Sequence, residues 1–170
     1  MSLDLPLIWA GIIATAVLFY VMLDGFDLGV GILFPFASEA ERDVMIDSIA
    51  PVWDGNETWL VLGGGGLFAA FPKAYAVIMP ALYGPIMLML LGLVMRGVAF
   101  EFRARGRARG RAFWTAAFAG GSITAAVAQG FVLGGFIQGV TLKDDAFSGG
   151  PLDWLTPYTL LVAAGLVAGY

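Results

Sequence analysis

The chain has 170 residues, of which 59% are hydrophobic and only 13% are charged, and its formal net charge at pH 7 is −4. A soluble domain usually carries about 25% charged residues, and the mean hydropathy here is +0.85, so the composition argues against a soluble domain and for a membrane protein. Cysteine and histidine are absent, which excludes disulfides, thiolate metal sites and the usual protein ligand of haem iron or zinc.

Five apolar runs meet or approach the length of about 20 residues that a helix needs to cross a bilayer. They are Leu5 to about Phe36, about Trp53 to Phe71, about Ala74 to Phe100, about Phe113 to Gln138, and Trp154 to Tyr170. The last run is still apolar at Tyr170, so we expect a truncated fifth helix. The predicted fold class is all-α: a polytopic transmembrane helix bundle with four complete helices (1–139), an extracytoplasmic loop (140–153) and the start of a fifth helix (154–170).

Basic residues predict the orientation of these helices. Six of the nine Lys and Arg residues lie between Arg96 and Arg111. Because loops rich in Lys and Arg face the cytoplasm, we expect a cytoplasmic Arg103–Arg111 loop, an extracytoplasmic N-terminus and a cytoplasmic loop over residues 37–50. Arginine alternating with glycine and alanine also occurs in nucleic-acid-binding segments. Beside membrane helices it favours an orientation signal or contact with anionic lipid, and no nucleic-acid partner is expected.

Two aspartates, Asp24 and Asp27, interrupt the first apolar run, where a carboxylate is costly. Their i, i+3 spacing places them on one face, near the predicted cytoplasmic end of the helix. The second helix begins on that side with Asp54 and Glu57, and the third carries Arg96 close to its cytoplasmic end. The third helix also carries Glu101 near that end. Three helices are therefore expected to bring five carboxylates and one arginine to the same membrane depth.

The residues alone leave three interpretations of this cluster open. The first is a water-exposed rim at the helix ends. The second is a structural ion pair in which Arg96 neutralises Asp27 or Asp54, and the third is a path for protons or cations. Glycine pairs such as Gly25 and Gly29 allow membrane helices to approach closely, as each interpretation requires. No phosphate-binding loop, nucleophile elbow or metal-ligand motif is present.

Four segments resemble a known family in sequence and in order. They are "DGFDLGVG" (Asp24–Gly31), "SIAPVWDGNETWLV" (Ser48–Val61), "GGGGLFAAFPKAYA" (Gly63–Ala76) and "RGVAFEFR" (Arg96–Arg103). Over Leu5 to about Gly139 the chain resembles subunit II of cytochrome bd-type quinol oxidases. The resemblance implies a complex of the bacterial cytoplasmic membrane that oxidises quinol and reduces oxygen to water. It also implies haem b and haem d held by a partner, subunit I, and in some members a structural quinone.

The resemblance also implies roles for particular residues. The family's acidic positions, implicated in a cytoplasmic proton route, fall on Asp27 and Asp54, and its basic position falls on Arg96. Subunit II stabilises the haem assembly, so no redox centre is expected in this chain alone. Family members are about twice as long, with eight helices, so the chain corresponds to their first half. The competing hypotheses are a proton- or cation-coupled transporter or channel and a purely scaffolding subunit.

Overall fold

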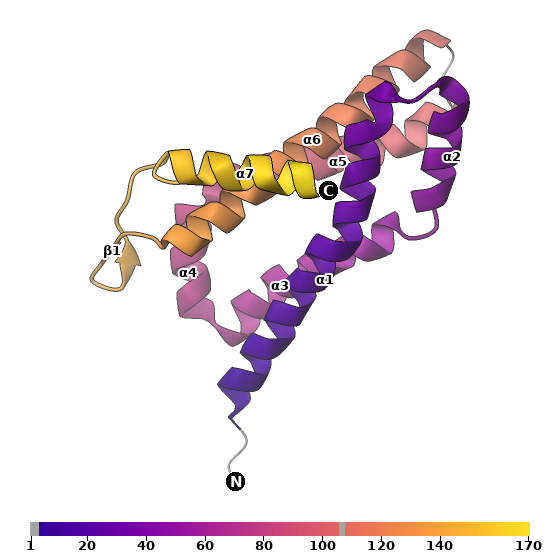
Figure 1. Cartoon of the computed structure of the whole chain (residues 1–170). Helices are drawn as coiled ribbons and strands as arrows, with labels where there is room; N and C mark the ends of the chain where they lie inside the picture. Colours follow the sequence, from indigo (N-terminus) through magenta and orange to yellow (C-terminus); the bar gives the residue numbers. More distant parts are fainter. Residues whose placement is uncertain (1–3, 106–107) are drawn as a thin grey trace.

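A computed structural model describes residues 4–105 and 108–170, and the side chains of residues 104–109 lie outside the description. Arg105, Arg107 and Arg109 of the predicted cytoplasmic loop fall among those side chains. The described residues form seven α-helices, one short 3-10 turn and one small hairpin (Figure 1). The elements are α1 (Leu5–Leu33), η1 (Phe34–Phe36), α2 (Glu39–Ile49), α3 (Trp53–Ala70), α4 (Pro72–Ala81), α5 (Tyr83–Arg105), α6 (Ala108–Gln138), β1 (Leu142–Lys143), β2 (Ala146–Phe147) and α7 (Pro157–Gly169).

The all-α membrane character predicted from composition is confirmed, although its details differ. Within the described ranges, three helical segments are long and apolar enough to cross a bilayer: Leu5–Phe36, Tyr83–Arg103 and Gly110–Gln138. The second predicted span, α3, has only 18 residues, and polar side chains occupy its first two turns. Length and composition therefore support three spanning helices instead of the four complete ones expected. The predicted fifth helix is present as α7, with 13 residues.

The third predicted span is wrong as a single helix from Ala74 to Phe100. The chain leaves the helical conformation at Leu82, where φ is −110° and ψ is 17°, and α4 and α5 meet there. Pro85 gives a physical reason for this break. Its ring would clash with the carbonyl of Ala81 in a continuous helix, and it has no N–H to donate to that carbonyl.

Two predicted loops contain regular structure. The acidic segment 37–50 forms α2, whose first turn is held by a reciprocal cap: the Ser38 N–H donates to Glu41 Oε2 at 2.7 Å, and the Glu41 N–H donates to Ser38 Oγ at 3.4 Å. The predicted 140–153 loop contains the antiparallel β1–β2 hairpin. Its two turn residues, Asp144 and Asp145, have φ of 51° and 61°, as a two-residue hairpin turn with the right twist requires.

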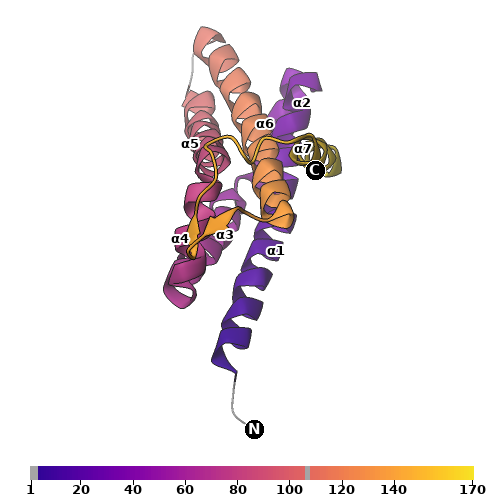
Figure 2. The same ribbon diagram turned by 90° about the vertical axis from the view of Figure 1, so that its left-hand side faces the viewer.

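Glycines set the closest helix contacts. Helices α5 and α6 run side by side (Figure 2) and have the most extensive contact in the fold. A Cβ added to Gly121 of α6 would lie 2.7 Å from the Gly92 carbonyl oxygen and 2.8 Å from the Arg96 nitrogen of α5. On the other side of the bundle, Gly63 and Gly66 of α3 face α1. The contact at Gly121 therefore fixes the depth at which Arg96 lies.

We expect Gly121→Ala to destabilise the protein by about 1–3 kcal/mol, because the added methyl meets backbone atoms that cannot rotate away. Gly120→Ala is the matched control, since a Cβ at Gly120 meets no atom within 4 Å. Thermal denaturation of the solubilised, full-length protein measures both changes. Equal melting temperatures for the two variants would contradict the close contact.

Candidate functional site

The guanidinium of Arg96 lies among three carboxylates that come from two other helices. Its Nη1 is 2.7 Å from Asp24 Oδ1 and 3.5 Å from Glu57 Oε1, and its Nη2 is 3.5 Å from Asp27 Oδ2. The side chains of Arg96 and Asp24 are each 1% exposed, that of Asp27 is 0% exposed, and that of Glu57 is 25% exposed. Helices α1, α3 and α5 thus meet at one charged centre, which we call the Arg96 cluster: Asp24, Asp27, Glu57 and Arg96.

The arrangement differs from the sequence expectation at Asp54. Its side chain is exposed in the first turn of α3, and it forms none of the ion pairs that Arg96 makes. The shortest contact of Arg96 is with Asp24 instead of Asp27 or Asp54. Asp54 precedes Glu57 by three residues, so it lies on the same face of α3. The exposure falls from Asp54 to Glu57 along α3, and the aspartates of α1 that face Arg96 are buried.

Asn56 is part of the site, although its amide carries no charge and the sequence analysis gave it no role. Its Nδ2 donates to Asp27 Oδ2 at 2.9 Å and to the Leu23 carbonyl oxygen at 3.4 Å. Asp27 Oδ2 therefore accepts from a neutral donor while it also faces Arg96. The sequence offered one sign that Asn56 belongs to the site: it lies between Asp54 and Glu57 in the polar first turns of α3.

The charges of the Arg96 cluster do not balance when every group is ionised. Three carboxylates face one guanidinium, which leaves two negative charges uncompensated in a largely buried site. Isolated buried charge is strongly unfavourable, and burial of an ion pair is tolerated only with good geometry and further hydrogen bonds. Each proton that a carboxylate takes up removes one uncompensated charge. The cluster is therefore chemically suited to exchange protons.

Small residues of α1 make room for neighbouring helices beside the cluster. A Cβ on Gly25 would lie 2.7 Å from Cδ1 of Tyr170, the residue that follows α7. A Cβ on Gly29 would lie 3.0 Å from the carbonyl carbon of Tyr170. Figure 1 shows the end of α7 reaching α1 at this level. The predicted small-residue pair therefore serves close packing next to the aspartates.

A second charged group lies where α2 meets the end of α5 and the start of α6. Arg103 Nη1 is 2.9 Å from Asp43 Oδ1, and its Nη2 is 3.3 Å from Glu39 Oε1. Arg111 contacts the same two carboxylates, with Nη2 2.8 Å from Asp43 and Nε 3.1 Å from Glu39. We call Glu39, Asp43, Arg103 and Arg111 the α2 clasp. It holds the acidic helix against the basic ends of two spanning segments.

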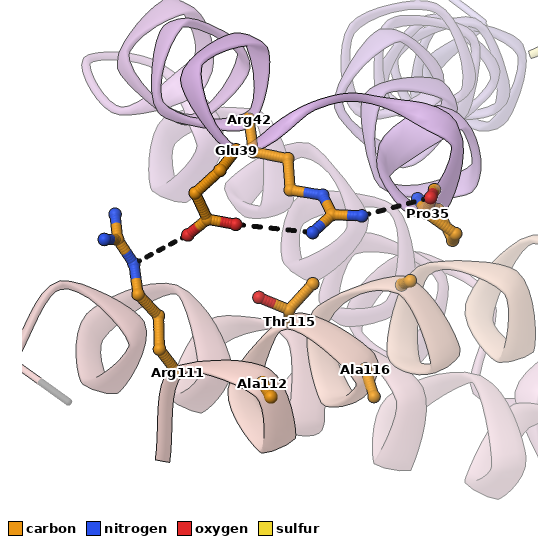
Figure 3. Close-up of a pocket in the computed structure, with 8 residues that line it drawn as sticks. Pro35, Glu39, Arg42, Arg111, Ala112, Thr115 and Ala116 are labelled. Atoms are coloured by element: carbon orange, nitrogen blue, oxygen red, sulfur yellow. Dashed lines mark hydrogen bonds and ion pairs between the residues drawn. The ribbon is translucent and has the colours of Figure 1, made fainter. Parts of the chain in front are cut away.

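A groove of about 810 Å³ opens beside the α2 clasp (Figure 3). Arg42 lies on one side of it, where its guanidinium donates to the Phe34 and Pro35 carbonyls and pairs with Glu39. The full lining is Pro35, Glu39, Arg42, Arg111, Ala112, Thr115, Ala116 and Ala119. The alanines give the groove a small apolar floor. Its arginines are already paired with carboxylates or carbonyls, so none of its lining side chains offers a free cationic group.

The family-model comparison matches residues 5–170 to cytochrome bd terminal oxidase subunit II. The chain belongs to this family of membrane proteins, and the resemblance seen in the sequence is confirmed.

Three curated relatives illustrate the match. Cytochrome bd-I ubiquinol oxidase subunit 2 of Escherichia coli is 36% identical over 172 residues, which cover 96% of this chain and 45% of the relative. Probable cytochrome oxidase subunit 2 of Haemophilus influenzae is 37% identical over 92% of this chain and 44% of the relative. Cytochrome bd ubiquinol oxidase subunit 2 of Bacillus subtilis is 45% identical over 100 residues, 58% of this chain and 30% of the relative. The chain thus spans less than half the length of these relatives.

The chain lacks the residue types that most often hold haem iron and structural zinc. Haem iron is held by His, Cys, Met or Tyr side chains, and the chain has neither His nor Cys. The buried Met89 lies inside an apolar cluster with Leu28 and Leu93. In residues 4–105 and 108–170, no three His, Cys, Asp or Glu side chains come together as metal ligands would.

The surroundings of Asp43 in the α2 clasp favour its ionised form. The hydrogen bond from Arg103 is the main reason that the pKa of Asp43 lies below its ordinary value. A carboxyl whose pKa is lower in the folded state stabilises that state above its unfolded pKa. The contribution is lost as the pH falls through the folded pKa.

We therefore expect α2 to detach from α6 only at acidic pH, below about 4. Spin labels on cysteines introduced at the exposed Val44 and Phe113 can follow this distance in the full-length subunit. The distribution of distances between the two labels should stay narrow near neutral pH and broaden in acid. Asp43→Asn should show a modestly broader distribution already at neutral pH, because only the Glu39 pairs with Arg103 and Arg111 remain, whereas Asp47→Asn, an exposed control on α2, should behave as wild type. An Asp43→Asn distance equal to that of wild type would contradict the clasp.

We expect Arg96→Gln to destabilise the full-length subunit by about 3–5 kcal/mol, because it leaves buried carboxylates without their counter-charge. Adding Asp24→Asn to Arg96→Gln should recover part of this loss. Arg111→Gln is the control, since the Arg111 side chain is 37% exposed and an exposed pair contributes about 0–1 kcal/mol. Equal losses for Arg96→Gln and Arg111→Gln in thermal denaturation would contradict the assigned burial.

Proposed function

We propose that the chain is part of a haem-free membrane subunit of a bd-type terminal oxidase that oxidises quinol and reduces oxygen to water. In this proposal, the subunit stabilises the haem-bearing subunit I and provides a cytoplasmic path for proton uptake. The supporting observation is the Arg96 cluster together with the decrease in exposure from Asp54 to Glu57 to Asp27 and Asp24. The names of the relatives, which describe ubiquinol oxidase subunits, support the complex-level activity.

The proposed path begins at Asp54, whose exposed carboxylate collects protons from water. Glu57, one turn further along α3, is partly exposed and already touches Arg96, so it connects the entrance to the buried groups. Asp27 and Asp24 form the inner end. Arg96 is the counter-charge of the buried carboxylates, and the surplus of carboxylates over guanidinium favours proton uptake.

The reduction of oxygen consumes protons as well as electrons, and a protein interior admits few water molecules. Carboxylates spaced along a helix can supply those protons where bulk water is excluded. Because this chain offers no fitting haem ligands, we assign haem b and haem d to subunit I, and no step within this chain involves them. The structural quinone implied by the family resemblance is assigned to no residue of this chain.

The proposed location is the bacterial cytoplasmic membrane, with the N-terminus outside and the Arg103–Arg111 segment inside. The α2 clasp supports this orientation, because it gathers Arg103 and Arg111 with α2 at one end of the bundle. This end would face the cytoplasm, where anionic lipid and basic side chains meet.

Family membership favours the oxidase over the transporter or channel hypothesis. Broken helices are typical of transporter substrate sites, and the α4–α5 break at Leu82 is such a feature. However, Leu82 precedes Arg96 by 14 residues, about 21 Å along a helix. The break therefore lies far from the carboxylates and gives no support to a substrate site there.

The test uses Asp27→Asn and Glu57→Gln in the full-length subunit assembled with its partner. Haem content is measured first, because the scaffolding hypothesis predicts that haem is lost together with activity. We expect haem to be retained and oxygen consumption to fall by about 10²-fold, the lower end of the effect of a positioned proton-transfer group. Asp47→Asn on α2 serves as the exposed control. Full oxygen consumption in both site variants would contradict the proton path.

A further inference from the structure

The two carboxylate oxygens of Asp24 have different surroundings. Oδ1 accepts from Arg96 Nη1 at 2.7 Å. Oδ2 is buried and has no hydrogen-bond partner within residues 4–105 and 108–170. The hydroxyl oxygen of Tyr20 is also buried and unpartnered within the same residues. A buried polar atom without a partner is rare and calls for an explanation.

Tyr20 lies beside Asp24 because both are on α1, four residues apart, and therefore on one face of the helix. Its hydroxyl faces the Asp24 carboxylate, without the geometry of a regular hydrogen bond. Only 2% of the Tyr20 surface is exposed. The charged and titratable groups around its hydroxyl are Asp24, Arg96 and Tyr170. Because Arg96 already occupies Oδ1, Oδ2 is the oxygen of Asp24 that is left for the Tyr20 hydroxyl.

Donor chemistry determines which oxygen of Asp24 can carry a proton. A guanidinium has five N–H donors and no acceptor, so the oxygen that faces Arg96 must remain an acceptor in both protonation states. A phenol hydroxyl both donates and accepts. It can donate to an ionised carboxylate and accept from a protonated one. Asp24 has two phenols near it, but the Tyr170 hydroxyl is directed to Gln129, whereas that of Tyr20 is directed to Asp24. Tyr20 is thus the neighbour suited to follow the change.

We propose that Tyr20 is a positioning residue for Asp24: it holds Oδ2 as the oxygen on which Asp24 takes up and releases its proton. This inference rests on the proposed proton path. On uptake, a proton arriving from the Glu57 side forms one O–H bond on Oδ2, and one negative charge is cancelled. The Tyr20 hydroxyl then turns from donor to acceptor. On release, the O–H bond breaks and Tyr20 donates again, while Arg96 stays bound to Oδ1.

The test is Tyr20→Phe in the full-length subunit within its complex. Infrared difference spectroscopy during turnover reads the C=O stretch of protonated carboxyls, and Asp24→Asn identifies the band that belongs to Asp24. We expect Tyr20→Phe to shift this band to higher frequency, because its hydrogen bond is lost, and to lower oxygen consumption several-fold at full haem content. Tyr83→Phe is the matched control, because Tyr83 is 63% exposed. It should change neither the band nor the rate.

An Asp24 band that is unchanged in Tyr20→Phe overturns the inference, as does the absence of any band that Asp24→Asn removes. If Tyr20→Phe loses haem, Tyr20→3-fluorotyrosine keeps the ring and the hydroxyl but makes the hydroxyl a stronger donor. Because protonated Asp24 donates to Tyr20 and a more acidic phenol is a weaker acceptor, the band must then shift to higher frequency, by less than removal of the hydroxyl would give, for the inference to stand. These outcomes are separate from the failure of the proton path itself, which shows as full activity in Asp27→Asn and Glu57→Gln.

Discussion

One guanidinium shared by three carboxylates organises this bundle. Arg96 belongs to α5, and its carboxylate partners belong to α1 and α3, so a single side chain joins three helices. Since lipid offers these groups no water, the helices cannot separate without exposing charge to a medium that does not solvate it. Helix α6 enters the same arrangement through the backbone contact between Gly121 and Arg96. Stability and proposed chemistry therefore depend on the same atoms.

The meeting of these helices could be foreseen because it follows from hydropathy and the distribution of arginine. Helix lengths and the basic segment gave the depth of Asp24, Glu57 and Arg96, and the structure brings these three together. Depth does not specify the direction of a side chain, however. That is why Asp54 was expected among the partners of Arg96 but lies exposed at the start of α3, and why Asp24 proved to be its nearest partner. The direction depends on helix rotation, which small residues such as Gly121 set by tertiary contact.

Other differences between the predicted and the observed elements have local causes in the sequence that hydropathy does not take into account. Pro85 breaks the helix before it, although the apolar run continues without interruption. Ser38 and Glu41 form a recognisable capping box, yet the position of the segment between two apolar runs favoured a loop. Asn56 and Tyr20 are a different case. They are neutral residues whose neighbours in the sequence include carboxylates, but the contact of Asn56 with Asp27 forms only when α1 and α3 pack together.

The position of the α2 clasp at the rim of the bundle has a consequence for its response to ionic strength. Asp43 and Glu39 are about half exposed, so dissolved ions reach them, whereas the aspartates beside Arg96 are sealed from solvent. Screening by salt acts on exposed pairs and hardly on buried ones. Concentrated salt should therefore loosen the acidic helix from the membrane helices while the charged centre below it stays intact. The two groups of ion pairs, although only a few turns apart, belong to different electrostatic environments.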